Sequence, residues 1–162
     1  MARLRARAPR GERAYGKVPR NRGKNETLIA SITLEDGMGE SVAMEGATDA
    51  ETFEAYVERF LAPTLQEGQV VMLDRLGAHR TRRVEELIEA RGAELLFLPS
   101  YSPDLNPIEE AFSKIKGIAR KAGARTREAL VEVIGRALDA VTPEDAAGWF
   151  GHAGYEPQDQ SL

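Results

Sequence analysis

The chain of 162 residues has no cysteine and only two histidines, His79 and His152. The absence of cysteine excludes disulfide scaffolds, thiolate zinc sites, iron–sulfur clusters and a cysteine nucleophile. So few histidines also exclude a histidine-rich metal site, and any metal is expected to be a hard cation held by carboxylates. No apolar run approaches the roughly 20 residues that cross a bilayer, so we expect no transmembrane segment.

Charge is distributed unevenly, although Lys+Arg (22) and Asp+Glu (26) nearly balance over the whole chain. Residues 1–24, here called the basic arm, carry a net charge of +8, and the remaining 138 residues carry −12. An arm of this kind predicts a polyanionic partner, and a solvated tail is the alternative. It lacks the apolar segment of a secretory signal, and its prolines and glycines would break a helical transit peptide. Its basic side chains are Arg3, Arg5, Arg7, Arg10, Arg13, Lys17, Arg20, Arg22 and Lys24.

The first half of the domain reads as a hairpin followed by a helix. Residues 27–34 are rich in β-branched side chains and predict a strand, and residues 41–45 predict the returning strand after a turn. Thr48 and Glu51 have the spacing of a capping box, and Pro63 is expected to end the helix that follows. The predicted inward face of this helix consists of Phe53, Tyr56, Val57, Phe60 and Leu61.

A strand–helix–strand pattern comes next. Residues 70–73 and 94–98 are short apolar runs typical of strands buried on both faces, with a helix over 82–91 between them. This order predicts a parallel pair with a right-handed crossover. Three helices follow, over residues 107–121, 127–141 and 143–150. We therefore predict one mixed α/β domain over 25–155, followed by a short tail of residues 156–162.

Two acids fall where such a fold places ligands, outside the carboxyl ends of strands. Asp74 directly follows the first parallel strand, where it could equally cap a turn. Glu109 lies at the third position of a helix that begins with Asn106 and Pro107, and Asn-x-x-Glu is itself a capping-box pattern. The functional interpretation is that both carboxylates share a pair of Mg²⁺ ions and act on a phosphodiester.

Polar side chains continue from Glu109 along one stripe of the same predicted helix. Ser113, Lys116 and Arg120 follow it at helical spacing, so an acid at the tip is followed by cations. This arrangement suits a metal site beside a phosphate backbone, and a solvated helix face has the same pattern.

Longer segments carry a family resemblance. The strings LDRLGAHR (73–80) and LPSYSPDLNPIEEAFSKIK (98–116), with 34 residues between Asp74 and Glu109, closely resemble bacterial insertion-sequence transposases of the mariner-like superfamily, the DDE endonucleases. Segments 7–32, 45–65 and 125–155 are similar to other parts of such proteins, so the resemblance extends over nearly the whole chain. The string Ser-Pro-Asp-Leu-Asn-Pro-Ile-Glu is its most specific part.

The resemblance implies an α/β, RNase H-like fold of the integrase and transposase type, a mixed sheet flanked by helices. It also implies a triad of two Asp and one Glu, in which Asp74 matches the second acid and Glu109 the third. Two Mg²⁺ or Mn²⁺ ions would serve cleavage at the ends of a mobile element and attack of the freed 3′-OH on target DNA. The expected partner is DNA, and the expected location is the bacterial cytoplasm, in association with the nucleoid.

The match to the family pattern breaks in two places. The family's first Asp lies on the first strand of the sheet, just before the segment that matches the basic arm, and we expect that strand and acid to be missing here. A two-acid site should bind Mg²⁺ poorly, and the neighbouring strand should be left unpaired. Arg75 stands where the family usually has Asn, and it is expected to compete with Mg²⁺ for Asp74 or to pair with DNA.

Other side chains of the motif have less specific roles. His79 matches the family pattern, and its expected role is hydrogen bonding or packing beside Asp74 rather than metal binding. Tyr101 and Trp149 are able to stack on bases, but both are expected to be core or loop anchors.

Two functional hypotheses follow. In the first, the chain is the catalytic domain of a DNA transposase, encoded as the downstream part of a split or frameshifted gene and completed by an upstream product. Its candidate protein partners are that upstream product or further copies of the same chain in a homo-oligomer. In the second, it is a non-catalytic remnant that binds DNA or a full-length transposase through the basic arm. A gene start placed too far downstream would account for the missing strand under either hypothesis. No DNA-end recognition segment precedes the domain, so this role is expected to lie elsewhere.

Overall fold

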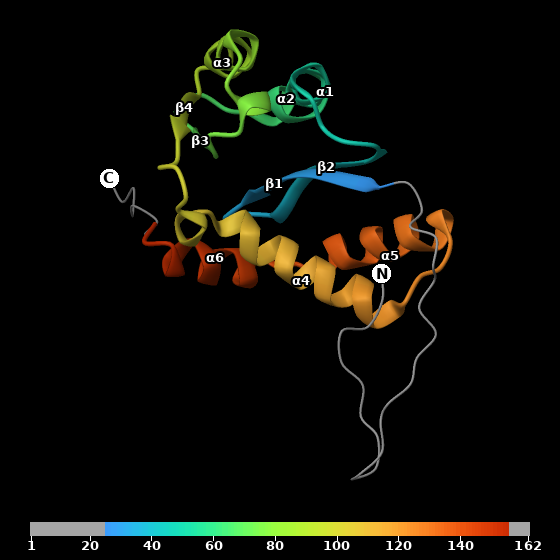
Figure 1. Cartoon of the computed structure of the whole chain (residues 1–162). Helices are drawn as coiled ribbons and strands as arrows, with labels where there is room; N and C mark the ends of the chain where they lie inside the picture. Colours follow the sequence, from blue (N-terminus) through green and yellow to red (C-terminus); the bar gives the residue numbers. More distant parts are fainter. Residues whose placement is uncertain (1–24, 156–162) are drawn as a thin grey trace, which may run out of the picture.

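The computed structural model describes residues 25–155, which form layers of helices on the two sides of short strands (Figure 1). Helices α1, α2 and α3 lie on one side, and α4, α5 and α6 lie on the other. The elements are β1 (Glu26–Thr33), β2 (Gly37–Glu45), α1 (Ala50–Tyr56), the π-helical turn η1 (Val57–Leu61), α2 (Ala62–Thr64), β3 (Val70–Leu73), the 3-10 turn η2 (Gly77–His79), α3 (Arg82–Glu89), β4 (Glu94–Phe97), the 3-10 turn η3 (Pro103–Leu105), α4 (Pro107–Ala122), α5 (Arg127–Asp139) and α6 (Pro143–His152).

The strands form two separate pairs in the described part of the chain. β1 pairs with β2 in an antiparallel hairpin, and β3 pairs with β4 in parallel. The hairpin turn brings Gly37 close to the start of α6, where a Cβ atom would lie 2.9 Å from the carbonyl oxygen of Val141. Gly37 also has a φ of 80°, so both space and backbone conformation require glycine at this turn.

The segment from α1 to α2 departs from the predicted regular helix. Its N-cap is Asp49, whose carboxylate accepts the Thr52 N–H at 2.9 Å, so the predicted capping box of Thr48 and Glu51 is wrong. Pro63 offers no N–H to the preceding turn, which here widens into the π-helical turn η1. This wider turn changes the rotation per residue, and Phe60, expected inside, is 39% exposed.

The parallel pair and its crossover helix form where the sequence predicts them. Thr81 caps α3 by accepting the Val84 N–H at 3.3 Å, and Gly92, with a φ of 74°, follows the end of the helix. The expectation that both strands are buried on both faces is wrong, because Val70 is 53% exposed and Leu96 is 44% exposed. Among the described helices, α3 packs against this pair, whereas α4, α5 and α6 contact the hairpin instead.

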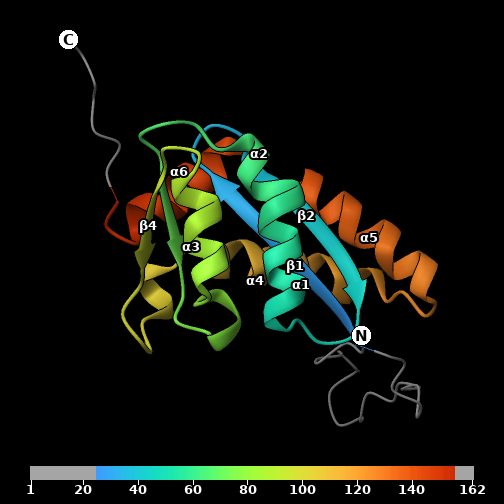
Figure 2. The same cartoon turned by 90° about the horizontal axis from the view of Figure 1, so that it is seen from above.

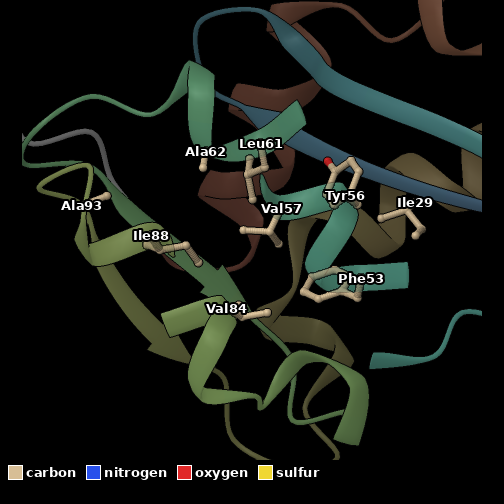
Figure 3. Packing of buried hydrophobic residues seen from close by; sticks show 9 residues of the cluster. All are labelled: Ile29, Phe53, Tyr56, Val57, Leu61, Ala62, Val84, Ile88 and Ala93. Atoms are coloured by element: carbon tan, nitrogen blue, oxygen red, sulfur yellow. The ribbon is translucent and has the colours of Figure 1, made fainter. Parts of the chain in front are cut away.

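One apolar core nevertheless joins the two strand pairs. It gathers Ile29 of β1 with buried side chains of α1, η1 and α3, and half-buried side chains of β2, β3 and β4 pack against it. Figure 3 shows its buried members: Ile29, Phe53, Tyr56, Val57, Leu61, Ala62, Val84, Ile88 and Ala93. The described residues include no buried polar or charged residue. No helix among them is both long and apolar enough to cross a bilayer.

Candidate functional site

The candidate site begins where β3 and β4 end. The two strands run in register, Leu73 beside Phe97, and the Leu98 N–H donates to the Leu73 carbonyl at 2.8 Å. Because parallel strands end at the same edge of a sheet, Asp74 after β3 and the loop after β4 start side by side.

Asp74 is held by one of its two carboxylate oxygens. Its Oδ1 accepts the Leu76 N–H at 3.0 Å, so the turn-capping alternative is confirmed. The same oxygen lies 2.6 Å from Nδ1 of His79. No hydrogen bond within the described residues reaches Oδ2, and the side chain is 38% exposed. The turn therefore fixes Asp74 and still leaves one oxygen for a ligand.

His79 lies between the Asp74 carboxylate and Phe53 of α1. Its ring packs on Phe53 of α1, with the ring centroids 4.0 Å apart, and its side chain is 19% exposed. Nδ1 is buried and has no hydrogen bond of regular geometry, so its approach to Asp74 is a close contact without good alignment. His79 thus packs beside Asp74, as the sequence predicts.

Arg75 does not compete for the Asp74 carboxylate within the described residues. Its Nε donates to the Leu98 carbonyl at 3.3 Å, and no ion pair with Asp74 forms there. The residue is exposed, so its guanidinium is available to a phosphate group at the edge of the site.

Glu109 lies in the first turn of α4 and is exposed. The Asn106 side chain makes no capping hydrogen bond, so the predicted capping box of Asn106 and Glu109 is wrong. The first bond of the helix is instead a backbone one, from the Glu109 N–H to the Asn106 carbonyl at 3.0 Å. A capping box therefore does not explain the acid at this position, and its location in the first turn of α4 also suits the helix dipole.

Asp74 and Glu109 line one cavity of about 380 Å³, together with Arg75, Leu76 and Tyr101. The structure thus brings together the two acids that the sequence singles out. Among residues 25–155, no group of three or more His, Cys, Asp or Glu side chains is placed to hold a metal ion. Cation binding by Asp74 and Glu109 therefore stays a prediction, and these two carboxylates form the acidic set of the cavity.

Glu109 also borders a second hollow of about 310 Å³, whose lining includes Glu110, Trp149 and His152. Trp149 packs against the apolar cluster of α4 and α5, as expected of a core anchor. The position of His152 near Glu109 has no signal in the sequence, because the two residues are joined only by the packing of α6 on α4.

The predicted cationic stripe of α4 faces solvent. Ser113, Lys116 and Arg120 are all exposed, and Lys116 Nζ lies 5.8 Å from the centroid of the Phe112 ring. Contact with DNA stays a prediction for these side chains. The nine basic residues of the arm, Arg3 to Lys24, lie outside the described residues.

Tyr101 differs most from its expectation. It is fully exposed, with a relative accessibility of 102%, so it anchors neither the core nor the loop. It is also the non-glycine residue of the described chain with a positive φ, 60°, a conformation that costs a side-chain-bearing residue about 1–2 kcal/mol. The sequence pattern of its loop, rich in Pro and Ser, predicts a turn but not which side chain is presented to solvent.

Solved structures share this fold. The chain matches the crystal structure of the Mos1 strand transfer complex with a TM-score of 0.67 and 18% identity, covering 94% of this chain and 46% of that one. The match to the Mos1 mariner paired-end complex with Mn has a TM-score of 0.65 and 17% identity, and it covers 95% of this chain and 47% of that one. The match to the Mos1 transposase catalytic domain with raltegravir and Mg has a TM-score of 0.59 and 15% identity, and it covers 81% of this chain and 75% of that one. The chain spans about half the length of the first two Mos1 chains.

These likenesses confirm the predicted mixed α/β fold of the RNase H-like, transposase type. No curated protein sequence matches the chain. The family model for DDE superfamily endonucleases matches residues 1–131, which is most of its length. On that match, the chain belongs to the DDE superfamily endonucleases.

Proposed function

We propose that the chain is the catalytic domain of a DNA transposase, in which Asp74 and Glu109 hold divalent cations for cutting and joining phosphodiester bonds. The observation that carries the proposal is that both carboxylates line one cavity at the carboxyl ends of β3 and β4. Membership of the DDE endonucleases supports the reaction class. The Mos1 structures with Mg or Mn support the choice of ion. A bacterial insertion-sequence origin, with action at the nucleoid, stays a prediction of the motifs.

The oxygen atoms that Asp74 and Glu109 offer are of the type that binds a hard divalent cation. Oδ2 of Asp74 and the exposed carboxylate of Glu109 are oxygen ligands of the type that Mg²⁺ and Mn²⁺ prefer. When bound, such ions would activate the attacking oxygen and stabilise the leaving oxygen of the phosphodiester. In number the set falls short, because no third acid of the described residues joins the two.

The chain's own side chains position this chemistry. The Leu76 N–H holds Asp74 at the strand end, with His79 packed beside it, and the start of α4 positions Glu109. Arg75 at the cavity, with Lys116 and Arg120 along α4, supplies positive charge for the phosphates on either side of the reacting bond. The ends of the mobile element and the target are the DNA substrates in this proposal.

A third acid would fit into the sheet layer. In the described chain β1 pairs only with β2 and β3 only with β4, so each has a second edge without a partner strand. Figure 2 shows β1 and β3 as the neighbouring members of the two pairs, running in roughly opposite directions. Both pairs pack on one apolar core, so a strand inserted between them would complete a single sheet.

The direction of such a strand follows from its neighbours. A strand parallel to β3 runs antiparallel to β1, and its carboxyl end then lies beside Asp74. An acid at that end would add a third carboxylate to the cavity, which is the place of the first Asp in the family pattern. The inserted strand must be apolar on both faces, because helices lie on both sides of the layer. The Arg-rich sequence of the basic arm lacks that character.

The non-catalytic alternative, a remnant that binds DNA or a full-length transposase, rests on the same shortage of acids. The nucleotide sequence upstream of the Met1 codon separates the two. A preceding or overlapping frame that ends in a strand followed by Asp favours a catalytic domain completed by that segment. Stop codons in every frame favour the remnant.

The metal proposal is tested by titrating the full chain with Mn²⁺ and following free Mn²⁺ by electron paramagnetic resonance. We expect weak binding that Asp74→Asn and Glu109→Gln each reduce by about tenfold or more, because each removes a charged ligand. Glu110→Gln is the matched control, since Glu110 is the next residue on α4 and does not line the Asp74 cavity. Equal binding by the Asp74 and Glu110 variants would contradict the site. Mg²⁺-dependent DNA joining by this chain alone, lost in Asp74→Asn and in Glu109→Gln, would contradict the proposal that the two-acid site is incomplete.

A further inference from the structure

Tyr101 combines two properties that its fold does not explain. Its side chain is exposed over its whole surface, and its backbone is held in a left-handed conformation that favours glycine. The large apolar side chains of the described residues are far less exposed, with Leu76 next at 59%. A protein gains no stability from either property, and strained backbone of this kind collects at sites of function.

The position of Tyr101 connects it with the two acids. It lies in the loop between β4 and α4 and lines the cavity that holds Asp74 and Glu109. Pro99 and Pro103 stand on either side of it in this loop, and each fixes its own φ. The loop therefore presents an aromatic ring, free of contacts with the described chain, at the rim of the candidate metal site.

We propose that Tyr101 is a positioning residue that stacks on an unpaired base of the DNA strand beside the reacting phosphodiester. The inference rests on the proposed function, because it takes DNA as the ligand of the Asp74–Glu109 cavity. Base stacking is insensitive to sequence, since every base has a π-face, and an exposed phenol ring offers the complementary surface. Arg75 lines the same cavity and supplies a phosphate contact next to the stacked base.

The choice of DNA over a protein partner follows from the surroundings of the ring. The charged residues that line its cavity are two carboxylates, which suit a divalent cation, and one guanidinium, and this charged set matches a phosphate backbone with bound metal. A protein interface would more typically surround an aromatic anchor with apolar neighbours. Here Leu76 is the exposed large apolar side chain that lines the cavity, and Pro99 and Pro103 are the other exposed apolar residues of its lining.

The test uses the full chain and DNA duplexes with a single-stranded overhang that carries 2-aminopurine. Stacking on tyrosine quenches this base, and anisotropy at one fixed salt concentration gives the affinity. We expect wild type to quench the probe and Tyr101→Ala to lose both the quenching and roughly 5- to 100-fold in affinity. Tyr101→Phe and Tyr101→Trp keep a stacking surface and should retain both. Phe60→Ala, which removes an exposed aromatic ring from η1, is the control and should behave as wild type.

Tyr101→Gly separates positioning from stability. Glycine relieves the positive φ, so this variant should melt about 2–4 °C above wild type while it loses quenching and affinity as the alanine variant does. If Tyr101→Ala and Tyr101→Gly bind and quench like wild type, the inference is wrong. If they instead lose only self-association, seen by light scattering, Tyr101 is a protein contact and the inference is equally overturned.

The experiments give different results if the proposed transposase function is wrong and if only the role of Tyr101 is wrong. A wild-type chain that neither binds the duplexes nor loses Mn²⁺ binding in Asp74→Asn contradicts the proposed function itself. A wild-type chain that binds DNA and Mn²⁺ as expected, with no effect of Tyr101→Ala, contradicts only the role of Tyr101.

Discussion

The Tyr56 side chain lies in the core under β2 and donates its hydroxyl to the Glu40 carbonyl at 2.8 Å. Burial raises the pKa of Tyr56 to about 12, because the phenolate is poorly solvated there, and the negative charge of Glu40 acts in the same direction. Below pH 10 the phenol is neutral in both the folded and the unfolded chain. Above pH 10 the unfolded chain ionises first, so stability falls as the pH rises.

We expect the free energy of unfolding to drop by roughly 2 kcal/mol between pH 10 and the folded-state pKa of about 12. Urea unfolding at a series of pH values measures the drop. Tyr56→Phe should remove this part of the pH dependence and cost about 1 kcal/mol at neutral pH, because it loses the hydrogen bond to Glu40. An alkaline slope that is the same in both proteins would show that other groups cause it.

At the level of elements, the start of α6 ties the C-terminal helices together. Thr142 Oγ1 accepts the Asp145 N–H at 3.2 Å and the Asp145 carboxylate accepts the Thr142 N–H at 3.0 Å, which forms a capping box. The same carboxylate pairs with Lys114 of α4. The hydrogen bond from Lys114 is the main cause that lowers the pKa of Asp145.

Thr142→Ala should destabilise the chain by about 1 kcal/mol, because α6 loses a side-chain acceptor for its first free N–H groups. Thr142→Ser keeps the hydroxyl and should stay within a few tenths of a kcal/mol of wild type. The midpoint of urea unfolding gives both values. Identical midpoints for the two variants would mean that the cap contributes nothing beyond the fixed φ of Pro143.

Periodicity and turn residues predict most elements of this fold, because the spacing of apolar residues follows the period of the helix or strand whose inner face they form. The errors arise where neighbours compete. Asp49 takes the cap predicted for Thr48, and the π-helical turn before Pro63 turns Phe60 outward. The exposure of Val70 and Leu96 depends on which helices cover β3 and β4, and local sequence does not contain that information.

The sequence likewise predicts part of the candidate site. Asp74 and Glu109 follow from the motif and from strand and helix ends, and the structure brings them to one cavity. The sequence also allows each acid to have only a capping role, and side-chain geometry alone decides this. Asp74 does cap its turn, whereas Asn106 and Glu109 do not form a capping box. Tyr101 shows the limit, since the exposure of a loop side chain depends on the backbone conformation of that one residue.

For the whole molecule, charge separates into a basic arm of residues 1–24 and an acidic remainder. The acidic remainder repels a polyanion at long range, so binding to DNA is expected to depend on the arm. Each phosphate contact releases about one condensed counterion, which makes affinity steeply dependent on salt.

Deletion of residues 1–24 should weaken DNA binding and flatten its dependence on salt. With nine basic residues removed, the slope of log K against log[salt] should become less negative by up to about 8, at 0.9 per contact. Fluorescence anisotropy across a salt series measures it, and deletion of the tail, residues 156–162, serves as the control. An arm deletion that leaves affinity and slope unchanged would show that the arm is a solvated tail.

Within the described residues, β1 and β3 each have one edge without a partner strand, and this also bears on how the chain behaves at high concentration. Backbone N–H and C=O groups without a partner are a template for any other extended segment, including the same edge of another copy. Overproduced by itself, the polypeptide should therefore collect in inclusion bodies rich in intermolecular β-structure. Co-expression with whatever segment fills the layer should suppress that aggregation by occupying the groups that nucleate it.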